Sequence, residues 1–384
     1  FGSSSNGRCR SIGTAIAMEL LAQAGRPGGR FMEQPSVAGE LRLCGGDGSP
    51  YSNKMLALLR FRRLPFRWLN MSGPEAAGTA KPPGPVLAPK LLFPDGAAMN
   101  DSTFLIKELE TRYQGRSVVP SNGALAFLVA LLEDYCDEWL TKAMFHYRWT
   151  YDIETAGFGI GASMGFSAGI DNIKHMGTAF GQRQVARLRN VVGSNETTGP
   201  VIEQSFDRLC RLLESHFHAG HEFLFGSRPS AADFALFGQL HPMISLDPET
   251  SRRVFAASRT VWFWYHSLKD LSGLSLGDEE GGWFQPEALP PTLFALFVEV
   301  GRLYVPFMLA NAEAVVAEQK EFECKLDSGR IRWHQSSFKY QAKCLGWLRE
   351  HYTNLSETDR QAVDAVLAGT GCTALLQQHF ISKM

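Results

Sequence analysis

The sequence of 384 residues lacks any Cys-x-x-Cys pair, although it contains seven cysteines. These cysteines lie far apart in the chain, and their number is odd. The spacing therefore argues against a zinc ribbon and against a secreted disulfide framework, and it favours a reducing compartment.

Long hydrophobic runs and a surplus of one charge are also missing. The closest candidate for a bilayer span, 292–317, is interrupted by Glu299, Arg302 and Glu313, whereas a span needs roughly 20 apolar residues. We therefore expect that the chain is not an integral membrane protein. The 38 lysines and arginines balance 39 acidic residues, so we expect no nucleic-acid partner.

The bulk composition, 45% hydrophobic and 20% charged, is typical of a globular protein with two or three domains. The first 30 residues differ, because they carry four arginines, several serines and one acid. Such a composition is typical of organellar transit sequences. We interpret residues 1–38 as a leader and expect an organellar, mitochondrial location. A disordered or truncated start and a cytoplasmic location are the alternatives.

Residues 40–115 alternate between strand and helix patterns. Glu40–Cys44 predicts a strand that enters a glycine-rich loop, and Asn53–Arg63 has helical spacing. After a second strand at 65–69 and a Pro/Gly/Ala-rich loop, two short strands surround the turn at Pro94-Asp95-Gly96. Ser102 then opens a helix to Tyr113. The order is βαβ followed by ββα.

The remainder of the chain has helical periodicity. Leu125–Arg148 and Pro200–His221 predict long helices. Between them, Gly157–Gly169 is rich in glycine but lacks the strand and the Gly-Lys-Ser/Thr that a phosphate site needs, so we predict a loop near a cleft. A basic helix, Gln182–Arg189, follows this loop.

Four motifs in this order resemble those of glutathione S-transferases. They are Ser49–Ser52 at a helix start, Ala88–Leu91 before a hairpin, Asn100–Ser102 opening a helix, and Phe225–Phe234 at the start of a core helix. The resemblance implies an α/β thioredoxin-like domain followed by an all-α domain, with a C-terminal helical extension. Ser230 and Asp233 also form a capping-box pattern, whose role is structural.

The resemblance implies a glutathione-binding domain at 39–116, a helical transferase domain at 122–285 and the extension at 286–384. Amphipathic patterns at 292–317 and 338–352 predict helices within the extension. The extension either packs on the second domain or forms a surface for a partner.

By this resemblance, Ser49 is the candidate catalytic residue. A helix N-terminus stabilises an anion, and a hydroxyl there lowers the pKa of a thiol by donating a hydrogen bond to the thiolate. Tyr51 and Ser52 are the alternative hydroxyls and candidate glutathione-binding residues, and Ser49 and Ser52 are also plausible as plain helix caps. A reductase is disfavoured, because serine cannot form a mixed disulfide.

The resemblance also implies two binding segments for glutathione, which would be a co-substrate. Pro89 matches the family's cis-proline, which would turn the backbone of Ala88 toward the peptide; the alternative is an ordinary trans proline. Asp101 and Ser102 match the pair that holds the γ-glutamyl group, although a plain helix cap is the alternative.

The second substrate is expected to be a small apolar electrophile. Candidates for its site are the aromatic residues Tyr135, Trp139, Phe145 and Tyr147, although such residues more often form core. The histidines at 216, 218 and 221 do not complete a ligand shell, so we expect no metal.

Two functions remain open at this point. The first is a glutathione transferase, as a homodimer or within a larger complex. The second is a non-catalytic accessory or scaffold subunit of a larger, mitochondrial assembly, because fold alone does not carry function.

Overall fold

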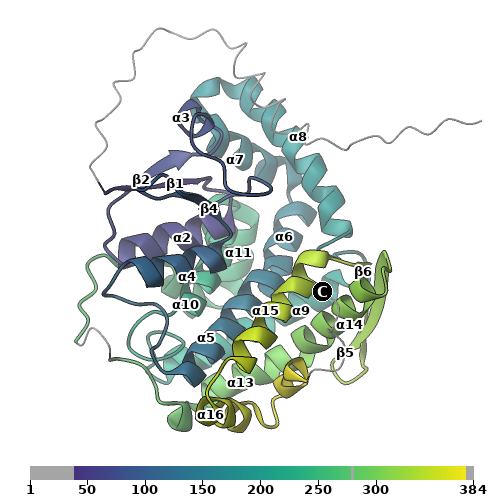
Figure 1. Cartoon of the computed structure of the whole chain (residues 1–384). Helices are drawn as coiled ribbons and strands as arrows, with labels where there is room; N and C mark the ends of the chain where they lie inside the picture. Colours follow the sequence, from purple (N-terminus) through teal and green to yellow (C-terminus); the bar gives the residue numbers. More distant parts are fainter. Residues whose placement is uncertain (1–38, 278–280, 378–384) are drawn as a thin grey trace, which may run out of the picture.

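The computed structural model describes residues 39–277 and 281–377, so the predicted leader lies outside the described residues. A four-stranded sheet forms the first unit (Figure 1). Its order is β2-β1-β3-β4; β1 and β2 are parallel and the other pairs are antiparallel. The elements are β1 (Leu41–Gly45), α2 (Pro50–Phe61), β2 (Phe66–Asn70), α3 (Pro74–Ala77), β3 (Lys90–Leu92), β4 (Ala98–Asn100) and α4 (Ser102–Arg112). This arrangement confirms the predicted thioredoxin-like domain.

The helix α2 connects this unit to the helical domain. Ser49 caps its N-terminus and Pro50 occupies the first turn, where a missing N–H is harmless. The apolar positions Met55, Leu58 and Leu59 are fully buried in the main core. Because α2 also packs along α10 (Ala231–His241), the sheet domain and the helical domain share one continuous core.

The helical domain begins with three consecutive helices that the sequence predicts as one. They are α5 (Gly123–Tyr135), the π-helix η1 (Cys136–Leu140) and α6 (Thr141–Thr150). The remaining elements are α7 (Ile153–Gly165), η2 (Phe166–Ala168), α8 (Ile170–Arg189), α9 (Gly199–His218), α10, η3 (Pro242–Leu246), α11 (Pro248–Ala257) and α12 (Arg259–Leu268). The predicted capping box of α10 is confirmed, and nearly the whole of that helix is buried.

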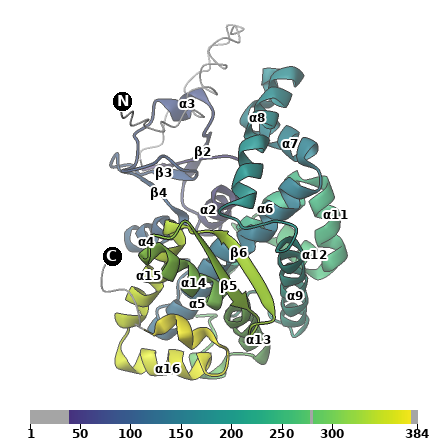
Figure 2. The same ribbon diagram turned by 90° about the vertical axis from the view of Figure 1, so that its right-hand side faces the viewer.

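The glycine-rich segment is a helix, so the predicted loop is wrong. It forms most of α7, which packs against α8 in a hairpin beside the sheet (Figures 1 and 2). A Cβ on Gly177 would lie 2.0 Å from the carbonyl oxygen of Gly157, and one on Gly161 would lie 2.2 Å from that of Ile173. The glycines therefore permit backbone contact between two helices rather than a flexible loop. The helix α8 also begins well before the predicted Gln182.

The extension is not entirely helical, which corrects a second prediction. A hairpin of β5 (Glu321–Leu326) and β6 (Ile331–Ser336) separates α14 from α15. The other elements are η4 (Pro286–Ala288), α13 (Pro291–Glu299), η5 (Val300–Tyr304), α14 (Val305–Val316), α15 (Lys339–Thr353), α16 (Glu357–Leu367) and η6 (Cys372–Leu376). The alternating burial of β5 and the turn residues Asp327, Ser328 and Gly329, all with positive φ, are the hairpin signals that helical periodicity concealed.

One helix among the described residues, Pro291–Val316, is long and apolar enough to cross a membrane. An 18-residue window of this helix has a mean hydropathy of 1.7, and 56% of that window is buried inside the fold. The core helix of a globular protein has the same properties, and Glu299 within it pairs with Arg208 at 2.9 Å. The expectation that the chain is not an integral membrane protein therefore stays a prediction.

Candidate functional site

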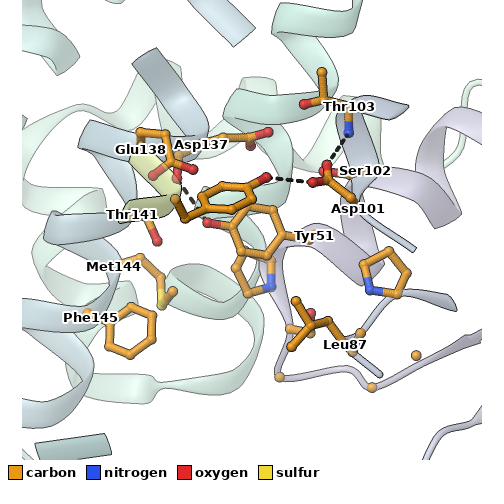
Figure 3. A pocket seen from close by; sticks show the side chains of 18 of the residues that line it. Tyr51, Leu87, Asp101, Ser102, Thr103, Asp137, Glu138, Thr141, Met144 and Phe145 are labelled. Carbon is orange, nitrogen blue, oxygen red and sulfur yellow. Dashed lines mark hydrogen bonds between the residues drawn. The ribbon is translucent and has the colours of Figure 1, made fainter. Parts of the chain in front are cut away.

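A cavity of about 850 Å³ lies where the sheet domain meets α5–α6, the α7–α8 hairpin and α15. Figure 3 shows part of its lining. Six of the seven predicted site residues line this one cavity: Ser49, Tyr51, Ala88, Pro89, Asp101 and Ser102. The seventh, Ser52, is fully buried and does not line it.

Ser49 is held at the N-terminus of α2 by contacts on both sides. Its Oγ accepts a hydrogen bond from the Ser52 N–H at 3.2 Å. The Asn53 amide donates to the carbonyls of Asp47 and Ser49, and Arg148 donates to that of Gly48 at 2.9 Å. The Ser49 oxygen therefore acts as a cap, and a serine hydroxyl that accepts a cap bond still has its proton to donate.

Neither alternative hydroxyl is placed to donate a hydrogen bond to a ligand in the cavity. The Tyr51 hydroxyl donates to the backbone carbonyl of Asp137 at 2.9 Å, although its ring lines the cavity. Burial raises the pKa of Tyr51 well above its usual value. Ser52 is buried beneath the turn, where its Oγ accepts from the Gly46 N–H at 3.4 Å.

The segment before β3 follows the predicted arrangement. The Ala88–Pro89 peptide bond is cis, as the sequence predicts. Both residues line the cavity together with Leu87. The Asn100 amide donates to the Pro85 carbonyl at 2.6 Å and so ties this loop to the end of β4.

Asp101 and Ser102 begin α4 at the other end of the cavity. Asp101 has a positive φ of 75° and caps the helix by accepting from the Thr103 N–H. Its other carboxylate oxygen accepts a 2.6 Å hydrogen bond from the hydroxyl of Tyr340 on α15. Ser102 is buried, and its Oγ accepts from the Lys54 ammonium at 3.3 Å.

Four carboxylic acids of α5 and η1 also line the cavity, and the sequence analysis missed them. We call Glu133, Asp134, Asp137 and Glu138 the acidic wall. Their i, i+4 spacing aligns them on one helix face. The available signal was the presence of four acids in an otherwise apolar helix, since ionised groups are seldom buried without a partner.

Lys54 neutralises half of this wall. Its ammonium lies 2.6 Å from both Glu133 and Asp137, and all of these groups are buried. Burial alone would lower the pKa of Lys54, but Asp137 and Glu133 outweigh it and raise that pKa above its usual value. With Ser102 as third acceptor, the three N–H donors of this lysine are all used.

The other half of the wall has no such partner. Asp134 accepts a hydrogen bond from the Tyr304 hydroxyl, and Glu138 makes no ion pair with any cation in the described part of the chain. Burial, followed by the neighbouring acids, raises the pKa of Glu138 to about 8. Burial likewise raises the pKa of Asp134 to about 7.

A second buried lysine, Lys142, lies one turn beyond Glu138. Its ammonium donates to the Val192 carbonyl and to Gln335 Oε1, both at 2.9 Å, and it lies 4.3 Å from the ring centroid of Phe307. Burial lowers the pKa of Lys142 to about 7. Lys142 therefore joins α6 to the extension through the neutral amide oxygen of Gln335 on β6.

The apolar wall differs from the aromatic set expected for it. Phe145 lines the cavity, together with Met144, Trp149 and Phe180. The other three expected residues, Tyr135, Trp139 and Tyr147, do not line it. They lie on the opposite face of the same helices and pack in the core, where Trp139 donates to the Ser205 hydroxyl at 2.9 Å.

The histidines singled out by the sequence take part in packing. His216 is fully buried and bonds to the Thr292 hydroxyl and the Phe223 carbonyl. Burial lowers the pKa of His216 to about 4. Across residues 39–277 and 281–377, no group of three or more His, Cys, Asp or Glu side chains could hold a metal ion.

We compared the sequence and the structure with those of known proteins. No curated protein matches the sequence. The chain is similar to a solved glutathione S-transferase from Methylobacterium radiotolerans in complex with glutathione sulfonate, at 16% identity and a TM-score of 0.37, covering 60% of this chain and 90% of that one. It is also similar to one from Ceriporiopsis subvermispora in complex with glutathione, at 16% identity and a TM-score of 0.40, covering 62% and 99%.

A third solved structure, a glutathione transferase family member from Pseudomonas fluorescens with bound glutathione, is 16% identical with a TM-score of 0.32, covering 59% and 93%. The family models match in the expected order. The N-terminal domain of glutathione S-transferases matches residues 43–117, and the C-terminal domain matches residues 182–265. The chain belongs to the glutathione S-transferase family.

Proposed function

We propose that the protein binds glutathione and transfers its thiolate to a small apolar electrophile. The observation that supports this proposal is that one cavity is lined by Ser49, by Ala88 and Pro89, and by Asp101 and Ser102. These are the segments that would hold the sulfur, the peptide backbone and the γ-glutamyl group of one extended tripeptide.

The γ-glutamyl end would lie at α4. There the Ser102 hydroxyl accepts from Lys54 and keeps its own proton, which would be donated to the ligand carboxylate at the helix N-terminus. The Asp101 carboxylate would pair with the ligand ammonium. The backbone of Ala88 would contact the middle of the peptide.

The sulfur would lie near Ser49 at the N-terminus of α2. A hydrogen bond from the hydroxyl, together with the partial positive charge of the helix end, favours the thiolate over the thiol. The thiol proton would pass to solvent, and the thiolate would form a thioether with an electrophile seated against Phe145, Trp149 and Phe180. This electrophile would release its leaving group as an anion.

The test compares wild type with Ser49→Ala and Ser49→Thr. We expect retention on immobilised glutathione and conjugation of a generic aryl halide by wild type, with kcat/KM lower by about 100-fold in Ser49→Ala, because a transition-state hydrogen-bond donor is lost. Ser49→Thr keeps both the hydroxyl and the cap, so it should retain most of the activity. Equal activity of all three proteins would contradict the role of Ser49, and a folded wild type that neither binds glutathione nor turns over would contradict the function.

One observation favours the non-catalytic alternative, an accessory subunit of a larger assembly. Tyr340 already donates to the Asp101 oxygen that would receive the ligand ammonium. If this contact blocks the site, Tyr340→Phe should create glutathione binding that wild type lacks, as measured by calorimetry. If the tyrosine instead shares the carboxylate with the ligand, the substitution should weaken binding. We also propose an organellar location, whether the protein is a transferase or an accessory subunit.

A further inference from the structure

The acidic wall of the cavity contains more carboxyl groups than its own lysine pairs with. Lys54 contacts Glu133 and Asp137 at 2.6 Å each and gives its third donor to Ser102. Glu138, one turn beyond Asp134 and only 7% exposed, makes no ion pair with any described cation. A carboxylate in this position is poorly solvated and lacks a counter-charge, which is an unfavourable state that a cation would relieve.

Lys142 makes no direct contact with Glu138, although its charge opposes the rise in the pKa of that acid. It follows Glu138 by one helical turn, but its ammonium points to Val192 and Gln335 among aromatic rings. No ion pair joins it to Glu138 within the described residues. The buried carboxylate and the buried amine therefore coexist without direct contact.

Two further hydrogen-bond acceptors beside Glu138 also have no donor among the described residues. Gln341 lines the cavity and is 3% exposed; its amide nitrogen donates to the Glu138 backbone carbonyl at 3.3 Å, while its Oε1 has no hydrogen-bond partner. The Oδ1 of Asp137 is likewise without a partner. Buried polar atoms are nearly always bonded, so acceptors left over beside a cavity indicate a missing donor.

The titratable groups that face Glu138 from other elements carry no charge near neutrality. They are Tyr51 on α2, Tyr304 on η5, and Tyr340 and Cys344 on α15. Burial raises the pKa of each of them. On the helix of Glu138 itself the charged neighbours are Asp134, Asp137 and Lys142. Glu138 therefore holds a proton at neutral pH, because its pKa lies at about 8.

We propose that Glu138, with Gln341 beside it, binds the ammonium group of a second substrate whose apolar body lies against Met144 and Phe145. In Figure 3, Glu138, Thr141, Met144 and Phe145 follow one another along the same wall. The electrophile accepted by this transferase is then an apolar molecule with a primary amine, which narrows the proposed function and rests on it. On binding, the Glu138 proton passes to the buffer and the carboxylate pairs with the ammonium.

The experiment titrates the whole protein with benzylammonium and with benzyl alcohol, first alone and then with saturating S-methylglutathione. Calorimetry at pH 7 in two buffers of different ionisation enthalpy measures both affinity and proton release. The variants are Glu138→Gln and the control Glu350→Gln, which removes an exposed acid of α15 that does not line the cavity.

We expect wild type to bind benzylammonium at least tenfold more tightly than the alcohol, with release of about one proton. Glu138→Gln should lose both the preference and the proton release, whereas Glu350→Gln should keep them. Equal affinity for amine and alcohol in wild type, or unchanged behaviour of Glu138→Gln, would overturn the inference. Displacement of the amine by S-methylglutathione would also overturn it, because the amine would then occupy the γ-glutamyl position. Failure of S-methylglutathione to bind would contradict the proposed function alone, since the first titration does not depend on it.

Discussion

Lys54 and Lys142 are both almost fully buried beside the same cavity, yet their surroundings are opposite. Lys54 on α2 faces two carboxylates of α5 and η1, which raise its pKa. Lys142 on α6 faces a carbonyl and an amide oxygen, and burial lowers its pKa to about 7. Where the two transferase domains meet, buried charges are paired. Where the extension packs, a buried acid and a buried amine are kept neutral by their protonation states instead.

The largest expected effect is that of Lys54→Met. The substitution leaves Glu133 and Asp137 buried without a cation, and breaking a buried pair in this way destabilises by about 3–5 kcal/mol. Urea denaturation at pH 7 measures the loss. The exposed Lys343→Met on α15 is the control and should change stability by less than about 0.5 kcal/mol. If Lys54→Met is as stable as wild type, the ion pairs of Lys54 with Glu133 and Asp137 do not stabilise the fold, which contradicts our interpretation.

A smaller effect is expected for Glu138→Gln, and it depends on pH. Because the pKa of Glu138 is raised from 4.5 to about 8 in the folded protein, the folded state binds a proton that the unfolded chain has released. The stabilising contribution is therefore complete below about pH 4.5 and is lost as the pH rises through 8. Between pH 5 and 8, wild type should lose about 3–4 kcal/mol more than Glu138→Gln does.

Denaturation series at several pH values measure that difference, with Glu350→Gln following wild type. Parallel curves for wild type and Glu138→Gln would mean that another group already neutralises the acid. In that case the unpaired half of the wall would resemble the paired half.

The smallest effect concerns Lys142→Met and has the opposite sign. Since burial lowers the pKa of Lys142 from 10.5 to about 7, the unfolded chain binds the proton that the folded protein has released. Wild-type stability should therefore rise with pH above 7, by about 1–2 kcal/mol between pH 7.5 and 9 relative to the variant. Guanidinium denaturation at both pH values measures it. A pH-independent difference would indicate that Lys142 is charged in the fold, as Lys54 is.

Local sequence patterns were sufficient for much of the fold. The Ser49–Pro50 helix start, the two short strands after Pro89 and the capping box at Ser230 depend on residues a few positions apart, and each was predicted correctly. The errors were also local. Glycines that allow helices α7 and α8 to touch were interpreted as a loop, because a single sequence does not show the partner helix. The hairpin β5–β6 was concealed between two helical patterns.

The residues of the candidate site were likewise predicted only in part from the sequence. Ser49, Ala88, Pro89, Asp101 and Ser102 were found by motif, and the cavity brings them together. The acidic wall was not found, because the sequence around it has the periodicity of a core helix and does not reveal which face is hollow. Three of the four aromatic candidates were placed wrongly for the same reason, and Phe145 was placed correctly.

The sequence by itself determined the order of the two domains, the cap of α2 and the residues of the glutathione motif, because these depend on neighbours along the chain. The tertiary structure decided which charges meet. Lys54 contacts acids 79 and 83 positions away, and Tyr340 reaches Asp101 across 239 residues. Such pairs form when packing brings distant helices to within hydrogen-bond distance, and the energy of a buried charge depends on that contact rather than on its place in the chain.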